Sequence, residues 1–119
     1  MLADWAIRYA AAPSTSVRNV LLVGDFNIPS VKSETFQVLE ERGMLVPTAL
    51  ADVFGTDLAR GKRYDQILAV PRTDVRFVGG GAVDFYARAH RAIYPRLNKT
   101  EFTFEMSDHL PLWVEVGVG

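Results

Sequence analysis

The sequence predicts an α/β domain: a mixed β-sheet with helices on one face. Apolar residues recur at helical spacing in residues 2–12. An unbroken aliphatic run in residues 19–24 is typical of a central strand that is covered on both faces. One further helix and then mostly strands follow, and this order of elements favours a single layer of helices against the sheet.

Three helices are expected, in residues 2–12, 33–42 and 84–93. Pro13 ends the first pattern, and Pro95 follows the third, which is the weakest of the three. Ser33 can cap the second helix, and Gly43 is placed to end it. The chain therefore alternates helical and extended segments without a linker or an internal repeat.

Five strands are expected, in residues 19–24, 64–70, 74–78, 102–105 and 112–116. The second and third of these are predicted as two strands on either side of a turn at residues 71–73. The run Gly79–Gly81 is expected to end the third strand, because glycine weakens strand interiors.

The composition of the chain argues against several classes of function, among them cysteine-based chemistry and membrane spanning. The 119 residues are 49% hydrophobic and 23% charged, which fits one globular domain or a part of one. A net charge of −1 gives no overall attraction to nucleic acid, so a site for a polyanion must be local. Cysteine is absent, which excludes disulfides, thiolate metal sites and a cysteine nucleophile. There is no membrane span and no signal-peptide pattern, so we expect a cytoplasmic protein.

The first candidate site lies where the aliphatic run ends in Asp25 and Asn27. Residues two apart in a strand share a face, so both side chains would project from the carboxyl edge of the sheet, where ligands bind. A carboxylate there can orient water, and an amide can donate to a phosphoryl oxygen. The alternative is that the two residues only form an Asx turn.

A second acid, Asp65, stands inside an apolar strand and needs a partner, because an unpaired buried carboxylate is costly. His109, which follows Asp108 at the start of the last strand, can supply that partner. A carboxylate that fixes one ring nitrogen leaves the other free as a donor, acid or base. The alternative for His109 is a purely structural histidine.

Taken in order, the motifs GDFN, YDQI and SDHLPL resemble the C-terminal half of the endonuclease/exonuclease/phosphatase superfamily, the metal-dependent phosphoesterases related to deoxyribonuclease I. The resemblance covers residues 2–116, and residues 1–119 are interpreted as the C-terminal portion of such a domain. It implies that Asp25 activates the attacking water and that Asn27 contacts the scissile phosphate. It also implies that Asp65 supports His109, which binds a phosphoryl oxygen, and that Asp108 belongs with Asp25 to the metal-binding region.

A complete member of the family is about twice as long, and its first half resembles nothing in this sequence. That half supplies an Asn, the principal magnesium-binding Glu and a further catalytic His or Tyr. His90 is a poor substitute and is interpreted as a surface-helix residue, although Arg88, Arg91 and Arg96 could approach a phosphate backbone. Acidic residues outside the motifs are interpreted as caps, turns or solvated charge: Asp52, Asp57 and Asp84. The expected fold is thus half of a four-layer α/β sandwich.

The implied function is Mg²⁺- or Mn²⁺-dependent hydrolysis of phosphate esters by the full-length parent, with nucleic acid favoured as substrate. The chain alone is expected to bind the metal weakly and to be inactive. Two alternatives stay open: a non-catalytic interaction module, and a phosphatase acting on a small phosphorylated molecule or lipid. Because helices can cover only one face of the sheet, we also expect a homodimer through the exposed face.

Overall fold

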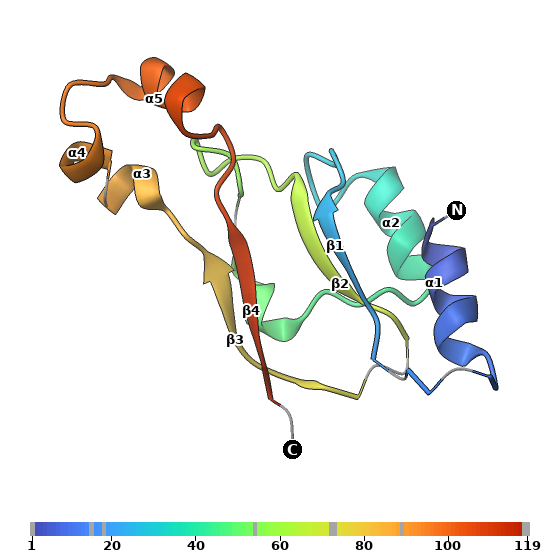
Figure 1. The fold of residues 1–119 in the computed structure, drawn as a ribbon. Coiled ribbons are helices and arrows are strands. Elements are labelled where there is room, and N and C mark those ends of the chain that lie inside the picture. Colours follow the sequence, from blue (N-terminus) through green and yellow to red (C-terminus); the bar gives the residue numbers. More distant parts are fainter. Residues whose placement is uncertain are drawn as a thin grey trace.

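The computed structural model describes residues 2–14, 16–17, 19–53, 55–71, 74–88 and 90–117, without the side chains of residues 88, 90 and 91. Helices and strands together make an α/β fold (Figure 1). In chain order the elements are α1 (Leu2–Ala11), β1 (Leu21–Asp25), α2 (Glu34–Glu41), the short 3-10 helix η1 (Thr48–Leu50), β2 (Asp65–Ala69), β3 (Arg76–Ala82), α3 (Phe85–Arg88), α4 (His90–Ile93), α5 (Lys99–Glu105) and β4 (Leu112–Gly117). Two of the three expected helices and four of the five expected strands are confirmed in outline, whereas residues 84–93, expected as one helix, contain two short helices, α3 and α4, with residue 89 outside the described residues.

The strands form two antiparallel pairs, β1 with β2 and β3 with β4. The register of the first pair ends with Asp25 directly opposite Asp65. The register of the second pair is irregular between Phe77 and Gly79. The first pair therefore brings the end of β1 beside the start of β2, which are far apart in the sequence.

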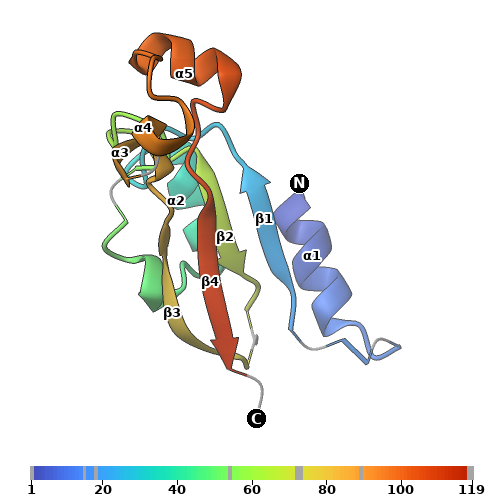
Figure 2. The same ribbon diagram turned by 60° about the vertical axis from the view of Figure 1, so that its left-hand side comes forward.

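β2 and β4 lie side by side and run in the same direction (Figures 1 and 2), but among the described residues no ladder joins them. The expectation of one mixed sheet is therefore wrong, since both ladders are antiparallel. The segment that leads into β4 forms its hydrogen bonds elsewhere. The Leu110 N–H donates to the Thr56 carbonyl oxygen at 2.6 Å, and His109 forms a β-bridge with Asp57.

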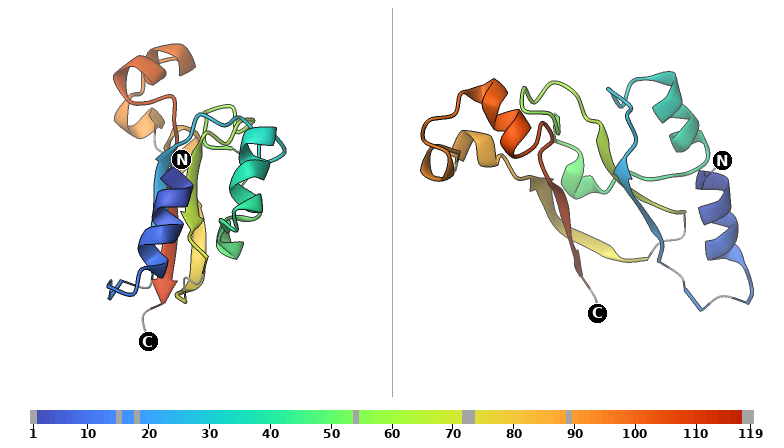
Figure 3. Two further views of the ribbon diagram at one scale, coloured as in Figure 1. Left: turned by 90° about the vertical axis from the view of Figure 1, so that its right-hand side faces the viewer. Right: turned by 45° about the horizontal axis from the view of Figure 1, so that its top comes forward.

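Helices cover one side of the strands. α2 and η1 lie on the same side in the edge-on view (Figure 3, left), and α1 lies beside β1 at the edge of the layer (Figure 2). α1 turns Ala3 and Ala6 inward, whereas Trp5 and Tyr9 stack on each other with 5.3 Å between ring centroids. These two aromatic side chains stay 54% and 42% exposed, so part of the apolar stripe of α1 faces solvent.

Two separate hydrophobic clusters hold the elements together. The first consists of Ala3, Ala6, Leu22, Ile28, Phe36, Leu39, Met44, Leu68 and Val70, and joins α1, β1, α2 and β2. The second has Leu58, Phe102 and Leu110 at its centre and joins the α3–α5 segment to the chain before β4. In the second cluster, the ring of Phe102 lies 5.3 Å from that of Tyr86 and 5.9 Å from that of Tyr94, between centroids.

Residues 102–105, expected as a strand, form the last part of α5 instead. Asn98 starts this helix with a capping box. Its Oδ1 accepts the Glu101 N–H at 2.9 Å, and the Glu101 Oε2 accepts the Asn98 N–H at 2.8 Å. These two bonds satisfy backbone donors at the start of the helix, and they outweigh the strand preference of the aromatic residues that follow.

The run Gly79–Gly81 continues β3 rather than ending it. A Cβ atom at Gly80 would lie 2.9 Å from the Leu50 Cδ2 and 3.1 Å from the Ala49 carbonyl oxygen, both in η1. On the opposite face, ring atoms of Trp113 lie 3.6 Å and 3.3 Å from the Cβ positions of Gly79 and Gly81. Neighbours thus approach the glycine backbone closely from both sides of the strand.

We predict that Gly80→Ala destabilises the protein by about 1–3 kcal/mol, because the added methyl group would overpack the contact with η1. Gly61→Ala is the matched control, since a Cβ there would meet nothing within 4 Å. The control should change the free energy of unfolding by about 0.5 kcal/mol or less. Urea denaturation followed by circular dichroism measures both, and equal effects of the two substitutions would contradict the close approach at Gly80.

Candidate active site

The ends of β1 and β2 place two carboxylates on one face. Asp25 is the last residue of β1, Asp65 is the first residue of β2, and the two lie directly opposite each other. Opposite residues of an antiparallel pair project to the same side. Leu22, on the alternate side of β1, is buried in the first cluster, so Asp25 and Asp65 face away from the helix-covered side.

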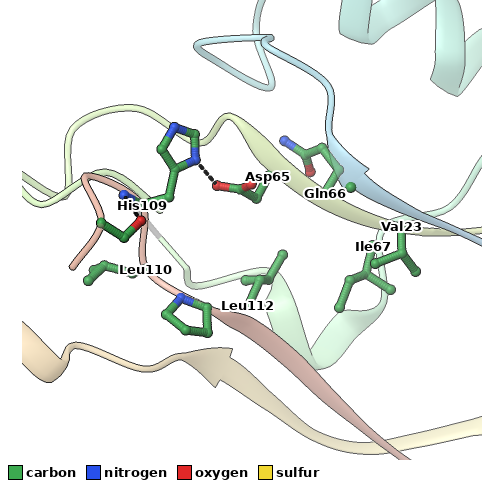
Figure 4. A pocket seen from close by; sticks show the side chains of 10 residues that line it. Val23, Asp65, Gln66, Ile67, His109, Leu110 and Leu112 are labelled. Carbon is green, nitrogen blue, oxygen red and sulfur yellow. Dashed lines mark hydrogen bonds and ion pairs between the residues drawn. The ribbon is translucent and has the colours of Figure 1, made fainter. Parts of the chain in front are cut away.

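His109 reaches this face from the segment that precedes β4. Its Nδ1 lies 2.8 Å from the Asp65 Oδ2 (Figure 4), which confirms the expected hydrogen bond between the two side chains. The His109 N–H donates to the Ser107 Oγ at 2.9 Å, and this bond helps to fix the backbone that carries the ring. An ionised carboxylate only accepts hydrogen bonds, so Nδ1 carries the proton and Nε2 is the free ring nitrogen.

The bonded pair borders a cavity of about 290 Å³ between the two strand pairs. Val23 and Ile67 line it from β1 and β2, and Leu112 lines it from β4 (Figure 4). The side chains of His109 and Asp65 are 31% and 22% exposed. An apolar, partly enclosed wall strengthens the electrostatic interaction of these two groups compared with the same groups in water.

The pKa of His109 lies above its ordinary value of 6.5. Burial by itself lowers this pKa, because it disfavours the charged ring. The hydrogen bond with Asp65 and the negative charges of Asp65, Asp108 and Asp25 act in the opposite direction and outweigh burial. A raised pKa keeps more of the ring protonated near neutral pH, so Nε2 can act as a hydrogen-bond donor there.

Asp25, Asp65 and His109 form a group that could hold a metal ion, with one ligand atom from each residue within 4.8 Å of the others. Within this group, Asp65 and His109 are hydrogen-bonded to each other. Asp25 is the carboxylate of the group that forms no side-chain hydrogen bond with the other two members. Asp108 is exposed and is not a member of this group; its charge acts on the His109 pKa.

Asn27 lies just beyond β1 with a φ of 54°, in the left-handed region. Its N–H donates to the Asp25 Oδ1 at 2.7 Å. This is the Asx turn considered as an alternative, and it positions Asp25 without using its second carboxylate oxygen. Because Asn27 is outside the strand, the rule that residues two apart share a face does not apply to this pair.

Two residues beside His109 were missed by sequence reasoning. The Tyr64 ring stacks on the His109 ring with 5.7 Å between centroids, and the Lys62 Nζ lies 5.9 Å from the centroid of the Tyr64 ring. Tyr64 directly precedes Asp65 and Lys62 precedes Tyr64 by two residues, so the available signal was their closeness in sequence to the strand acid. Tyr64 adds an aromatic ring next to the imidazole, and Lys62 adds a positive charge over that ring.

The remaining acids behave as expected. The Asp57 Oδ1 accepts the N–H groups of Gly61 and Lys62 at 2.8 Å each, and the Asp84 Oδ1 accepts the Ala87 N–H at 2.9 Å. Asp52 is exposed in a turn. Of the side chains expected on a surface helix or near a phosphate backbone, those of Arg88, His90 and Arg91 lie outside the part of the chain that the structure describes, and Arg96 is exposed.

Comparisons with known proteins add no relative. No family model matches the chain, and neither a curated protein nor a solved structure matches it. In the described part of the chain, no helix combines the length and the hydropathy that crossing a bilayer requires. The function of the site therefore has to follow from its own geometry and chemistry.

We predict that Asp65→Asn lowers the pKa of His109, since it removes the negative charge that raises this pKa and replaces a charged acceptor by the weaker, neutral amide oxygen. In the unaltered protein this pKa exceeds the value in the unfolded chain. The Asp65–His109 pair therefore contributes its full stability below the unfolded pKa and loses it as pH rises through the folded pKa. NMR titration of the His109 ring measures the shift. Asp108→Asn is the matched control and should cause a smaller decrease, because Asp108 acts by charge alone; an unchanged His109 pKa in Asp65→Asn would contradict the assignment.

Proposed function

We propose that this chain carries part of the active site of a metal-dependent phosphoesterase, with nucleic acid as the favoured substrate class. The observation that carries the proposal is the 2.8 Å hydrogen bond between the His109 Nδ1 and the Asp65 Oδ2, with Asp25 in the same group. A carboxylate beside an oriented imidazole combines a base for water with a donor for a phosphoryl oxygen. The ordered motifs GDFN, YDQI and SDHLPL support the same reaction by their resemblance to the endonuclease/exonuclease/phosphatase superfamily.

In this reaction Asp25 orients the attacking water and accepts its proton. The water oxygen forms a bond to phosphorus as the bond to the leaving oxygen breaks on the opposite side. The leaving oxygen departs with the bonding electron pair and takes a proton from solvent water. Asp65 holds the His109 ring, and the His109 Nε2 donates to a non-bridging phosphoryl oxygen whose negative charge increases in the transition state. The resemblance assigns the role of a second phosphate donor to the Asn27 amide. Asp65 is thus a positioning residue, and Asp25 and His109 touch the reacting atoms.

The neighbours of His109 favour a nucleic-acid substrate. The Tyr64 ring, which stacks on His109, and the Lys62 ammonium over that ring place an aromatic side chain and a positive charge near the proposed reaction centre. A positive charge there can contact a flanking phosphate of a nucleic acid. Tyr64 directly precedes Asp65, and Lys62 lies two residues before Tyr64.

A divalent ion, Mg²⁺ or Mn²⁺, fits the oxygen donors of this group only in part. Asp25 would hold it, with Asp108 assigned to the same region by the resemblance. When bound, the ion would stabilise negative charge on the phosphoryl group. Mg²⁺ favours six oxygen ligands, whereas the group here offers two carboxylates and an imidazole, and one of those carboxylates is bonded to the imidazole. We therefore expect weak metal binding by the chain alone.

The test is a substrate panel on the full-length parent that the resemblance implies, with Mg²⁺ present. We predict cleavage of DNA or RNA in preference to inositol phosphates, sphingomyelin and nucleotide-linked phosphates. Asp25→Asn and His109→Ala should each lower kcat by about 10²–10⁴-fold, the usual contribution of a general base or a charged donor. Asp52→Asn, a change at an exposed turn, is the control. The 119-residue chain by itself should show negligible turnover.

Full activity of the Asp25→Asn parent would contradict the mechanism. Cleavage of inositol phosphates or lipids without cleavage of nucleic acid would replace the nuclease assignment with the phosphatase alternative. No hydrolysis of any phosphate ester by the parent would favour the non-catalytic module. Robust metal-dependent cleavage by the chain alone would show that its site is complete.

The face of the strands opposite α2 and η1 carries exposed apolar side chains. Val23, which shares its side of β1 with Asp25, is 68% exposed, and Trp113 is 43% exposed. The molecule is also extended, with a radius of gyration of 16.5 Å where about 13.5 Å is typical of this length. Its accessible surface of 7832 Å² exceeds the roughly 6,400 Å² expected of a monomer of this mass.

We propose that a second copy of the chain covers this face. The excess surface is larger than the roughly 800 Å² per partner of a standard protein interface. Removing exposed apolar side chains such as Val23 and Trp113 from water is the favourable term that would offset the cost of association. A homodimer with strand face against strand face is therefore favoured.

We predict that light scattering of the purified chain at micromolar concentration reports a dimer and that Trp113→Lys shifts it to monomer. A lysine charge in the centre of an apolar interface would be desolvated without a partner. Phe104→Lys is the matched control, because Phe104 is 85% exposed on α5 and away from the strands; it should leave the dimer intact. A well-behaved monomer of the unaltered chain would refute the proposal.

A further inference from the structure

Thr56 is a polar residue with no exposed surface, in the segment that precedes β2. Its N–H donates to the Lys62 carbonyl oxygen at 2.9 Å, and its own carbonyl oxygen accepts the Leu110 N–H at 2.6 Å. Its Oγ1 accepts the Asp65 N–H at 3.2 Å. One buried residue thus binds the backbone of Asp65 and the backbone of the residue that follows His109.

The Asp65 N–H needs a partner outside the β1–β2 ladder. The Phe26 N–H donates to the Tyr64 carbonyl oxygen at 2.8 Å, which makes these two residues a hydrogen-bonded pair. Bonded and non-bonded pairs alternate along an antiparallel ladder, so Asp25 and Asp65 form a non-bonded pair and the Asp65 N–H points away from β1. Within the described residues no other strand is paired with β2. The Thr56 hydroxyl therefore takes the place of a ladder partner.

The segment that carries Thr56 is closed into a tight loop. The Asp57 Oδ1 accepts the N–H groups of Gly61 and Lys62 at 2.8 Å each, and the Asp57 N–H donates to the Lys62 carbonyl oxygen at 3.3 Å. Asp57 also forms an isolated antiparallel β-bridge with His109. These contacts fix the backbone at Thr56 relative to both halves of the Asp65–His109 pair.

We propose that Thr56 is a positioning residue of the candidate active site, whose hydroxyl holds Asp65 where its carboxylate meets the His109 ring. Its carbonyl oxygen holds the other half of the pair through Leu110. Hydrogen bonds weaken steeply as their distance and angle depart from the optimum, and both side chains of this 2.8 Å bond are partly exposed. A backbone fixed on both sides keeps the bond in place. Only the consequence for catalysis rests on the proposed function.

The alternative is that Thr56 contributes to stability alone, as a buried residue whose polar groups have partners. Its replacement would then lower the free energy of unfolding but leave the His109 ring unchanged in the molecules that stay folded. A positioning role predicts a change at the ring itself. The proton of the neutral ring reports this difference, because the Asp65 carboxylate holds it on Nδ1.

The experiment is ¹⁵N NMR of the His109 ring in the folded chain, at a pH where the ring is neutral. Thr56→Val removes the hydroxyl and should lower the fraction of rings that carry the proton on Nδ1. Thr56→Ser keeps the hydroxyl and should retain that fraction. Thr103→Val is the matched control, since the Thr103 Oγ1 donates to the Thr100 carbonyl oxygen at 2.6 Å within α5; it should leave the ring unchanged.

An unchanged ring in folded Thr56→Val, or an equal loss in Thr56→Ser, would overturn the proposal. In an Asp65→Ala background Thr56→Val should cause no further change, because no carboxylate is left to position; a further change would also overturn it. If Thr56→Val fails to fold, hydrogen exchange of the unaltered chain decides. The Asp65 amide should then be protected, and exchange at the rate of an unstructured peptide would contradict its bond to Thr56.

These measurements need neither metal nor substrate, so they are separate from the test of the proposed function. A parent without hydrolytic activity would refute that function and leave the role of Thr56 at the His109 ring intact. In an active parent, Thr56→Val should lower kcat by up to about 10²-fold with little change in KM, the effect of misplacing a reacting group by about 1 Å. Thr56→Ser should restore kcat, and an unchanged kcat in Thr56→Val would overturn the positioning role.

Discussion

The hydrogen bond between Asp65 and His109 is the interaction on which the arrangement of the site depends. Asp65 belongs to the first strand pair, and His109 lies on the segment that leads into the second. No described ladder of backbone hydrogen bonds joins β2 to β4. The Asp65–His109 hydrogen bond therefore connects two strand pairs that the described backbone does not connect. It fixes the ring, sets which ring nitrogen is free and gives the Asp65 carboxylate the partner that its partly buried position requires.

The division between the strand pairs follows from where each pair finds its hydrophobic cover. β1 and β2 pack through Leu22 and Leu68 onto α1 and α2. The chain before β4 packs through Leu110 into a different cluster around Phe102. Each pair is thus anchored to its own set of helices, and the cavity with its apolar wall occupies the space between them. The Asp65–His109 pair is therefore partly enclosed even though the four strands do not form one continuous sheet.

The sequence was sufficient for elements with a strong local pattern and for the pairing of Asp65 with His109. A carboxylate in an apolar strand needs a donor, and His109 was the available one. It was insufficient where tertiary contacts decide. The glycines of β3 stay in the strand, where Trp113 and η1 pack closely against them. These contacts come from distant parts of the sequence, so the local sequence pattern cannot predict them. The strand expected at residues 102–105 is wrong for a different reason: the capping box of Asn98 and Glu101 starts a helix that continues through these aromatic residues.

The separation of the two hydrophobic clusters also divides the chain in the order of its synthesis. The buried members of the first cluster lie between Ala3 and Val70, whereas those of the second lie between Leu58 and Leu110. Each cluster is therefore complete once its own stretch of sequence is available, although the pairing of β1 with β2 joins residues 40 or more apart. We expect the amides of β1 and β2 to become protected from hydrogen exchange before the last third of the chain has left the ribosome.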